Sequence, residues 1–285
     1  MVRQIFAAVL AGSLVGLITP LPVAAQEHAH EQPSPPRQKW SFAGPFGHFD
    51  EAQLQRGFKV YREVCANCHG LSMLSFRNLG DPGALGYSEG QIRQLAGEFK
   101  VQDGPNDQGE FFERNGRPAD RFPPPFPNDN AARARYNAVP PDLSVIAKSR
   151  TYERGFPWFI GDIFTQYQEQ GVDYLVAYLT GFEDKPPADV NLTAGLQYNR
   201  YFPGGGTSMP KPVQIYTAAV TYDDGTPTST EQYAKDVAAF LMWAAEPHLE
   251  ARKRVGFQVM VFLIILAGLL YFTKKKVWSA VKGHA

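Results

Sequence analysis

Residues 65–69 read Cys-Ala-Asn-Cys-His, a spacing typical of covalent haem attachment. Two thiols with two residues between them at the end of a helix can reach the two vinyl groups of one porphyrin. The imidazole of the next residue then lies under the iron. The pattern therefore predicts one haem c, bound through thioethers to Cys65 and Cys68, with His69 as an axial ligand of the iron.

Two other kinds of cysteine site share part of this pattern. A redox-active C-x-x-C pair needs a thioredoxin-like βαβ setting and a helix N-terminus, whereas this pair follows a predicted helix and no βαβ pattern comes after it. A zinc site needs two further ligands with their own spacing, and the chain has only two cysteines. The sequence therefore favours haem over either alternative.

The second axial ligand decides whether the iron is open to substrates, and the positions of the other histidines and methionines exclude most of them from this role. The remaining histidines lie in a linker, before the first expected helix, at the membrane junction or in the tail: His28, His30, His48, His248 and His284. Three methionines are excluded by position. Met1 begins the leader, Met242 faces away from the apolar stripe of its helix, and Met260 lies within the membrane. Met73 is only four residues from His69, a tether too short to reach the opposite face of the macrocycle.

Met209 remains, 140 residues after His69 in a Gly/Pro-rich loop that is free to approach the iron from the far side. A lone methionine is usually core filler, so the assignment depends on this elimination. His/Met ligation closes the iron to substrates and raises its potential, which favours electron transfer. A haem enzyme or ligand sensor with an open sixth position is the alternative.

A carbonyl that could accept a hydrogen bond from the axial histidine is available in the turn at residues 140–144. The backbone carbonyl of Pro141 could accept a hydrogen bond from Nδ1 of His69, because axial imidazoles normally donate their second N–H. The same residues would also be expected in an ordinary turn that leads into a helix, with Asp142 as the helix cap.

Two further positions could line the haem. Arg150 could pair with a propionate, although an unassigned arginine is more often simply solvated. Tyr198 could wall the porphyrin together with Tyr201 and Phe202, as aromatic residues of a generic core would also do.

Amphipathic helices are expected to frame this site. The first begins at the N-cap Asp50 and has one apolar stripe, formed by Leu54, Phe58, Tyr61 and Cys65. The second begins at a capping box, residues 228–231, and ends before Pro247, with its stripe at Tyr233, Val237, Phe240, Leu241 and Ala244. A third is expected at residues 167–179. The long Gly/Pro-rich stretches between them are predicted to wrap a large group that is not protein.

The two ends predict export and anchoring. Arg3 precedes an apolar run at residues 5–18, and Val23 and Ala25 suit the −3 and −1 positions of a signal-peptidase site. An uncleaved N-terminal anchor would need a longer run. Residues 255–272 contain one strongly polar side chain, Gln258, between two basic triplets. As a helix they would span about 27 Å, enough to cross a membrane.

These signals divide the chain into four parts. We expect a cleaved signal peptide at 1–25, a haem domain at 26–250, a membrane anchor at 251–273 and a cytoplasmic tail at 274–285. Because the signal peptide exports the large domain, the haem domain is expected in the periplasm, on a single-pass protein of the bacterial inner membrane.

The charge of the exported part disfavours nucleic acid as a partner. The chain has 28 basic and 28 acidic side chains, but its ends carry eight of the bases and no acid, so 20 bases face 28 acids in between. Such an acidic domain favours a basic protein partner. Acids gather at Glu98, Asp103, Asp107, Glu110 and Glu113. The same charges would also suit a loop that only keeps the protein soluble.

An ordered set of motifs resembles the cytochrome c1 family, the membrane-anchored haem c subunits of the quinol:cytochrome c oxidoreductase (the cytochrome bc complex, complex III), in its bacterial form. The motifs are Gly57-Phe58-Lys59-Val60-Tyr61 before the C-x-x-C-H run, then residues 101–106 (VQDGPN), 140–144 (PPDLS), 201–203 (YFP), Met209-Pro210, 224–227 (DGTP) and 243–247 (WAAEP).

The resemblance implies a mostly α fold like that of a class I cytochrome c, with long loop insertions and a single C-terminal transmembrane helix. It also implies thioether links at Cys65 and Cys68, axial ligation by His69 and Met209, and a propionate contact from Arg150. Some bacterial members carry an extra cysteine pair near the methionine loop. This chain has none, so we expect packing alone to hold that loop.

The function implied by the resemblance is one-electron transfer from the Rieske iron–sulfur protein to a basic cytochrome c, beside a cytochrome b subunit. The quinol would be oxidised on another subunit. No residue of the chain looks like a general acid or base, so we expect an electron-transfer subunit of an oxidoreductase without a substrate-converting site of its own. A stand-alone membrane-tethered electron carrier is a second alternative.

Overall fold

The structure is a computed structural model, and it describes residues 33–152, 156–165, 167–188 and 190–279. The chain divides into two units, Met1–Glu31 and Gln32–Ala285, and all described residues belong to the second. The predicted signal peptide and the end of the expected tail therefore lie outside the described residues.

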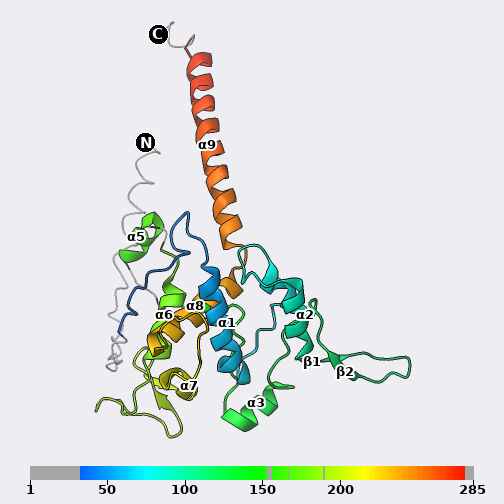
Figure 1. Cartoon of the computed structure of the whole chain (residues 1–285). Coiled ribbons are helices and arrows are strands. Elements are labelled where there is room, and N and C mark those ends of the chain that lie inside the picture. The colour runs from blue at the N-terminus through cyan, green and yellow to red at the C-terminus, as the bar shows by residue number, and fades with distance from the viewer. Residues whose placement is uncertain (1–32, 153–155, 166, 189, 280–285) are drawn as a thin grey trace, which may run out of the picture. The chain divides into compact units, whose positions relative to one another are not determined.

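The fold is mostly α, as the sequence predicts (Figure 1). The helices are α1 (Glu51–Glu63), α2 (Glu89–Gly97), α3 (Asp129–Tyr136), α4 (Ile146–Ser149), α5 (Trp158–Thr165), α6 (Gln170–Thr180), α7 (Val213–Tyr216), α8 (Thr230–Ala245) and α9 (Leu249–Val277). Two 3-10 turns lie at Cys65–Asn67 and Phe76–Gly80. Two antiparallel hairpins pair β1 (Lys100–Asp103) with β2 (Phe112–Asn115) and β3 (Gln197–Tyr198) with β4 (Gly206–Thr207).

Helices α1 and α8 cross at the centre of the core, and Gly57 allows them to approach closely. A Cβ atom at Gly57 would lie 2.0 Å from the carbonyl oxygen of Asp236 and 2.7 Å from the Cβ of Phe240. Beside this contact the rings of Phe58 and Tyr61 pack on Phe240, with centroids 5.4 and 5.7 Å away. The crossing therefore fixes the helix that leads directly to the two cysteines.

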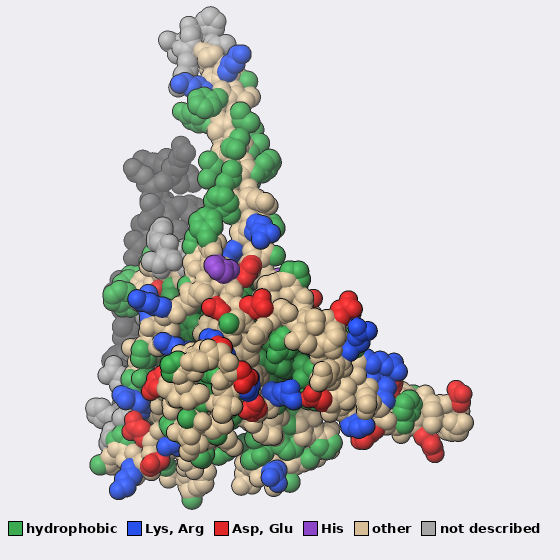
Figure 2. Space-filling view, viewed as in Figure 1, with side chains coloured by type: hydrophobic (Ala, Val, Ile, Leu, Met, Phe, Trp, Pro, Cys, Tyr) green, Lys and Arg blue, Asp and Glu red, His purple; other side chains and the backbone are tan. Residues whose placement is uncertain are grey.

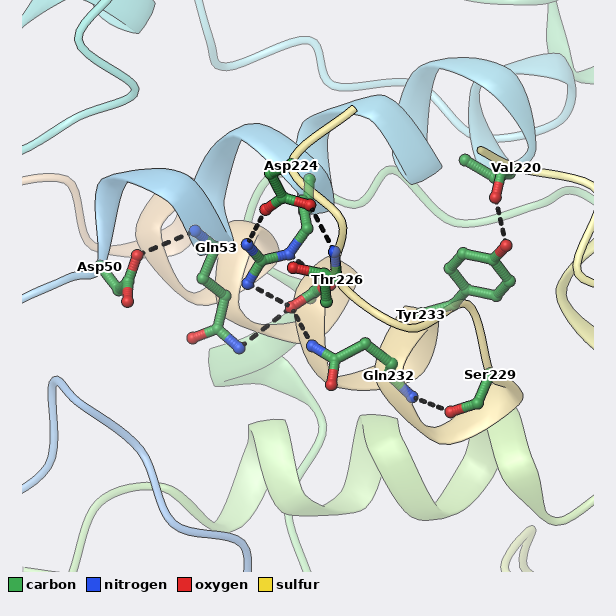
Figure 3. Close-up of polar contacts among 10 residues, drawn as sticks. Asp50, Gln53, Val220, Asp224, Thr226, Ser229, Gln232 and Tyr233 are labelled. Carbon is green, nitrogen blue, oxygen red and sulfur yellow. Dashed lines mark hydrogen bonds and ion pairs between the residues drawn. The ribbon is translucent and has the colours of Figure 1, made fainter. Parts of the chain in front are cut away.

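Side-chain caps start both crossing helices (Figure 3). Asp50 accepts a hydrogen bond from the N–H of Gln53 at 3.0 Å, as predicted. For α8 the predicted box was one residue too early, because Ser229 and not Thr228 accepts from the N–H of Gln232, at 3.2 Å. Serine and threonine are both good N-caps, so their composition alone does not fix the first turn.

Met242, which the sequence places away from the apolar stripe of α8, is nevertheless buried. Met242 is 1% exposed and belongs to the hydrophobic core. An apolar stripe marks the buried side of a helix whose other side is exposed to solvent. Helix α8 is instead packed against α1, α4, α6 and α7. The third predicted helix, 167–179, corresponds to α6, which begins three residues later at Gln170.

Helix α9 begins on the domain and continues as an exposed apolar rod. Leu249 is buried, and the carboxylate of Glu250 accepts a hydrogen bond from the N–H of Phe49 at 2.8 Å. From Val255 onward its large apolar side chains are exposed (Figure 2). In the described part of the chain α9 is the one helix that is long and apolar enough to cross a membrane.

Candidate functional site

The C-x-x-C-H segment follows α1 directly and is folded into a single turn. Helix α1 ends at Glu63, and the 3-10 turn Cys65–Asn67 comes next. The N–H groups of Cys68 and His69 both donate to the carbonyl oxygen of Cys65, at 3.0 and 2.9 Å. The turn therefore holds both thiols and the imidazole together at the end of a helix that the core fixes.

The surroundings of the two thiols do not suit a redox pair. Both cysteines are free of a disulfide. Burial against the core, with the neighbouring Cys68 as a second cause, raises the pKa of Cys65 to about 12, whereas reactive cysteines have lowered values. The Sγ of Cys68 lies 3.2 Å from the hydroxyl of Tyr136 on α3. Two thiols without a disulfide, on one turn beside a histidine, fit the geometry that thioether attachment requires.

The described residues also provide no ligand set for zinc. Among them, no group of three or more His, Cys, Asp or Glu side chains is arranged to hold a metal ion. The chemistry of the C-x-x-C-H turn therefore fits haem c better than it fits a redox-active cysteine pair or a zinc site.

His69 is 9% exposed, and its Nδ1 lies 2.7 Å from the carbonyl oxygen of Pro141. A carbonyl only accepts hydrogen bonds, so Nδ1 carries the proton and Nε2 keeps its lone pair. Burial lowers the pKa of His69, although the Pro141 carbonyl and Asp142 oppose that shift. The ring is therefore neutral at pH 7, with Nε2 as the nitrogen that can bind iron.

The segment after the histidine is tied to the turn that carries this carbonyl. The carboxylate of Asp142 accepts hydrogen bonds from the N–H groups of Ser72 and Ser144, both at 2.8 Å. The hydroxyl of Ser144 accepts from the N–H of Met73 at 3.0 Å. Asp142 is not the helix cap suggested from the sequence, because α4 begins at Ile146 with Val145 as its cap. Its role is to join the segment that follows His69 to the turn that carries the Pro141 carbonyl.

The loop that carries Met209 is held by hydrogen bonds, and the expectation of packing alone is wrong. The N–H of Met209 donates to the hydroxyl of Thr207 at 3.2 Å, and that hydroxyl lies 2.8 Å from the hydroxyl of Tyr178 on α6. Met209 itself is partly buried against the same core as Cys65. Spacing could have suggested Thr207, since Ser and Thr often bond the N–H two residues on, but no sequence signal points to Tyr178.

The hairpin before this loop is attached to α6 a second time. Asn199, fully buried, donates from its amide to the carbonyl of Tyr178 at 2.7 Å and accepts from the N–H of Tyr201 at 3.0 Å. Its own N–H donates to the carbonyl of Gly205 at 2.8 Å. A side chain at Gly205 would meet the ring of Tyr198 at 2.9 Å, and its φ of +75° also favours glycine. Tyr198 is thus a buried residue of the hairpin that precedes Met209.

Arg150 lies exposed directly after α4. Burial raises the pKa of Tyr178 to about 12, and the hydrogen bond from Thr207 and the charge of Arg150 oppose this shift. Burial also raises the pKa of Tyr174, again opposed by Arg150. The guanidinium of Arg150 therefore lies near α6, the helix to which the loop of Met209 is hydrogen-bonded through Thr207. Its contact with a propionate stays a prediction, as do the haem roles of the other residues.

A mostly helical domain with a C-x-x-C-H turn, a buried histidine on a proline carbonyl and a tethered methionine loop defines the class of c-type cytochromes. The model of the Cytochrome C1 family matches residues 40–281. A cytochrome b/c1 of Bradyrhizobium diazoefficiens is 63% identical over 246 residues, which are 86% of this chain and 36% of that protein. The cytochromes c1 of Blastochloris viridis and Rhodospirillum rubrum are 53% and 42% identical over 251 and 247 residues, covering 87% and 86% of this chain and 88% of each relative.

The chain belongs to the cytochrome c1 family. It is accordingly a haem c protein of electron transport, with one covalently attached haem.

Proposed function

We propose that the chain is the haem c subunit of a bacterial quinol:cytochrome c oxidoreductase, taking one electron from a Rieske iron–sulfur protein and passing it to a periplasmic cytochrome c. The observation that carries this proposal is the buried His69, bonded through Nδ1 to Pro141 at 2.7 Å, on a C-x-x-C-H turn in a chain of the cytochrome c1 family.

Each residue of the site has a distinct part in this proposal. Cys65 and Cys68 would hold the haem covalently, and the hydrogen bond from Nδ1 of His69 to the Pro141 carbonyl leaves Nε2 unprotonated for the iron. Met209 supplies the second axial ligand. The residues that line the haem are Arg150, beside a propionate, and Tyr198. Haem c with His/Met ligation supplies reversible one-electron chemistry at a raised potential.

The proposed function also implies how the chain is anchored in the membrane and which proteins it contacts. Helix α9 would anchor the domain in the inner membrane beside a cytochrome b subunit and a Rieske protein, with the haem domain in the periplasm. The acidic surface would attract a basic cytochrome c as electron acceptor, because complementary charge speeds encounter. No proton transfer by a side chain is needed for outer-sphere electron transfer.

The test compares the haem-loaded full chain in detergent with its Met209→Leu variant. We expect the wild type to show a c-type spectrum with the weak methionine-to-iron band and a positive potential, and Met209→Leu to lose both. Met73→Leu is the control, since Met73 is 62% exposed. A high-spin wild-type spectrum that shifts with carbon monoxide would instead mean an open iron and ligand chemistry.

A second experiment separates a complex subunit from a stand-alone carrier. Gentle detergent extraction from the native membrane should recover the chain together with a b-type haem protein and a Rieske protein. Recovery of the chain alone, with quinol oxidation unaffected by its deletion, would favour the tethered carrier.

A further inference from the structure

One buried hydroxyl joins the methionine loop to the rigid part of the domain. Thr207, in β4, is 4% exposed. Its Oγ1 accepts the N–H of Met209 at 3.2 Å and lies 2.8 Å from the hydroxyl of Tyr178. The peptide of Met209 is therefore connected to helix α6 through two consecutive hydrogen bonds.

This connection is directional in a way that packing is not. A threonine hydroxyl has one donor hydrogen and two acceptor sites. A buried hydroxyl without a hydrogen-bond partner destabilises the folded protein. Thr207 satisfies its hydroxyl only when the Met209 N–H and the Tyr178 hydroxyl are both within reach. A loop held by apolar contacts alone could slide, whereas this arrangement favours one backbone position at Met209.

The tyrosine is itself held firmly. Its ring packs on Phe182 and Phe202, with centroids 5.4 and 6.0 Å away. Its backbone carbonyl accepts the amide of the fully buried Asn199 at 2.7 Å. The hydroxyl of Tyr178 is therefore a fixed point against which the loop is placed.

We propose that Tyr178 and Thr207 are positioning residues for Met209, and that their hydroxyl pair sets how firmly the Met209 thioether is presented to the haem iron. The inference builds on the proposed axial role of Met209. It assigns to this pair the restraint that a disulfide near the loop would otherwise supply.

The test uses the haem-loaded full chain in detergent with three measurements: the methionine-to-iron band, the midpoint potential and the affinity of the oxidised protein for cyanide. Thr207→Val and Tyr178→Phe each remove one hydroxyl with little change of shape. We expect both to weaken the band, lower the potential and tighten cyanide binding roughly three- to tenfold, the loss that one hydrogen bond gives. The double variant should be no worse than Thr207→Val, which already breaks both hydrogen bonds, and Thr207→Ser should restore wild-type behaviour.

Two control variants remove equivalent hydroxyls elsewhere. Thr180→Val removes a hydroxyl that bonds within α6 itself, to the carbonyl of Val176, and Tyr233→Phe removes one that bonds the carbonyl of Val220. Neither should alter band, potential or cyanide affinity.

The positioning role of Thr207 and Tyr178 and the axial role of Met209 can be disproved independently. If Met209→Leu abolishes the band while Thr207→Val and Tyr178→Phe match wild type, the positioning role is wrong and the axial assignment stands. Equal effects of the test and control variants would also overturn the positioning role. If Met209→Leu keeps the wild-type spectrum, the axial assignment itself is wrong.

Discussion

The guanidinium of Arg56 on α1 lies 3.0 Å from the carboxylate of Asp236 on α8, whose side chain is fully buried. Gln53 and Gln232 donate their amides to the other oxygen of the same carboxylate, at 3.2 and 2.9 Å (Figure 3). Arg56 also bonds Asp224 at 2.6 Å. The carboxylate thus joins the helix that leads to the cysteines to the helix that crosses it.

Loss of the arginine should destabilise the domain strongly. Arg56→Met leaves the Asp236 carboxylate buried without its counter-charge, which should lower the free energy of unfolding by about 3–5 kcal/mol. Denaturant unfolding of the haem-loaded protein measures this. The control is Lys59→Met, one turn further along α1, whose partner Asp223 is largely exposed; it should have little effect.

A double variant tests the stated cause. Arg56→Met combined with Asp236→Leu removes both charges, and it should regain most of the stability lost in the single variant. A double variant as unstable as Arg56→Met alone would show that the arginine acts by packing and not by charge.

The close helix crossing gives a second stability prediction. Gly57→Ala places a Cβ atom 2.0 Å from the Asp236 carbonyl oxygen, so α1 and α8 must separate, and the free energy of unfolding should fall by about 3 kcal/mol. Gly90→Ala in α2 is the matched control. Its Cβ would meet nothing nearer than 3.9 Å, so it should leave stability unchanged or raise it by up to about 1 kcal/mol. Thermal unfolding of both variants decides the point.

The fold was predictable where one local signal had one structural solution. The cap at Asp50 and the apolar periodicity after it give α1, and an apolar run with Gln258 as its one strongly polar side chain gives α9. The four-residue helices α4 and α7 are too short to show any periodicity. The burial of Met242 could not be predicted, because a helix packed by neighbours on several sides has no exposed polar face.

The residues of the candidate site also fall into those that the sequence reveals and those that it does not. Cys65, Cys68 and His69 are recognised because their chemistry fixes their spacing. The contacts that hold them in place join residues far apart in sequence, such as Ser72 with Asp142 and Tyr178 with Thr207. Such pairs depend on tertiary packing, and no property of either residue alone reveals them.

The turn that holds the Pro141 carbonyl should make stability depend on pH. Partial burial works to raise the pKa of Asp142, but the hydrogen bonds from Ser144 and Ser72 outweigh it and hold that pKa below its ordinary value. A lowered pKa means that this carboxylate stabilises the fold above about pH 4, its ordinary range, and that the contribution is lost as pH falls further.

Asp142→Asn removes this titration, and urea unfolding between pH 2 and 6 measures it. The wild type should be more stable than the variant near neutral pH, and the difference should shrink as the pH drops below about 4. A constant difference across this range would show that Asp142 acts only through its shape. Asp107→Asn, at an exposed position of the β1–β2 hairpin, is the control for loss of a surface carboxylate.

The β1–β2 hairpin is the best local candidate for attracting a basic cytochrome c. Of the five acids noted from the sequence, Asp103 pairs with Arg114, and Glu98 pairs with Arg62 at 2.6 Å. The other three are exposed: Asp107, Glu110 and Glu113. Figure 2 shows acidic side chains on the arm of the molecule that this hairpin forms. The three of these five acids that are available to a partner thus all lie on the hairpin.

Neutralising these three acids together as Asn and Gln should slow association with a basic cytochrome c several-fold at low salt, because electrostatic steering is lost. The difference should vanish at high ionic strength, where charges more than about 3 Å apart are screened at 1 M salt. Stopped-flow electron transfer measures the rate. Neutralising the exposed Glu89, Asp129 and Glu231 instead changes the net charge equally; if it slows association as much, the net charge of the domain steers the partner and the hairpin has no special part.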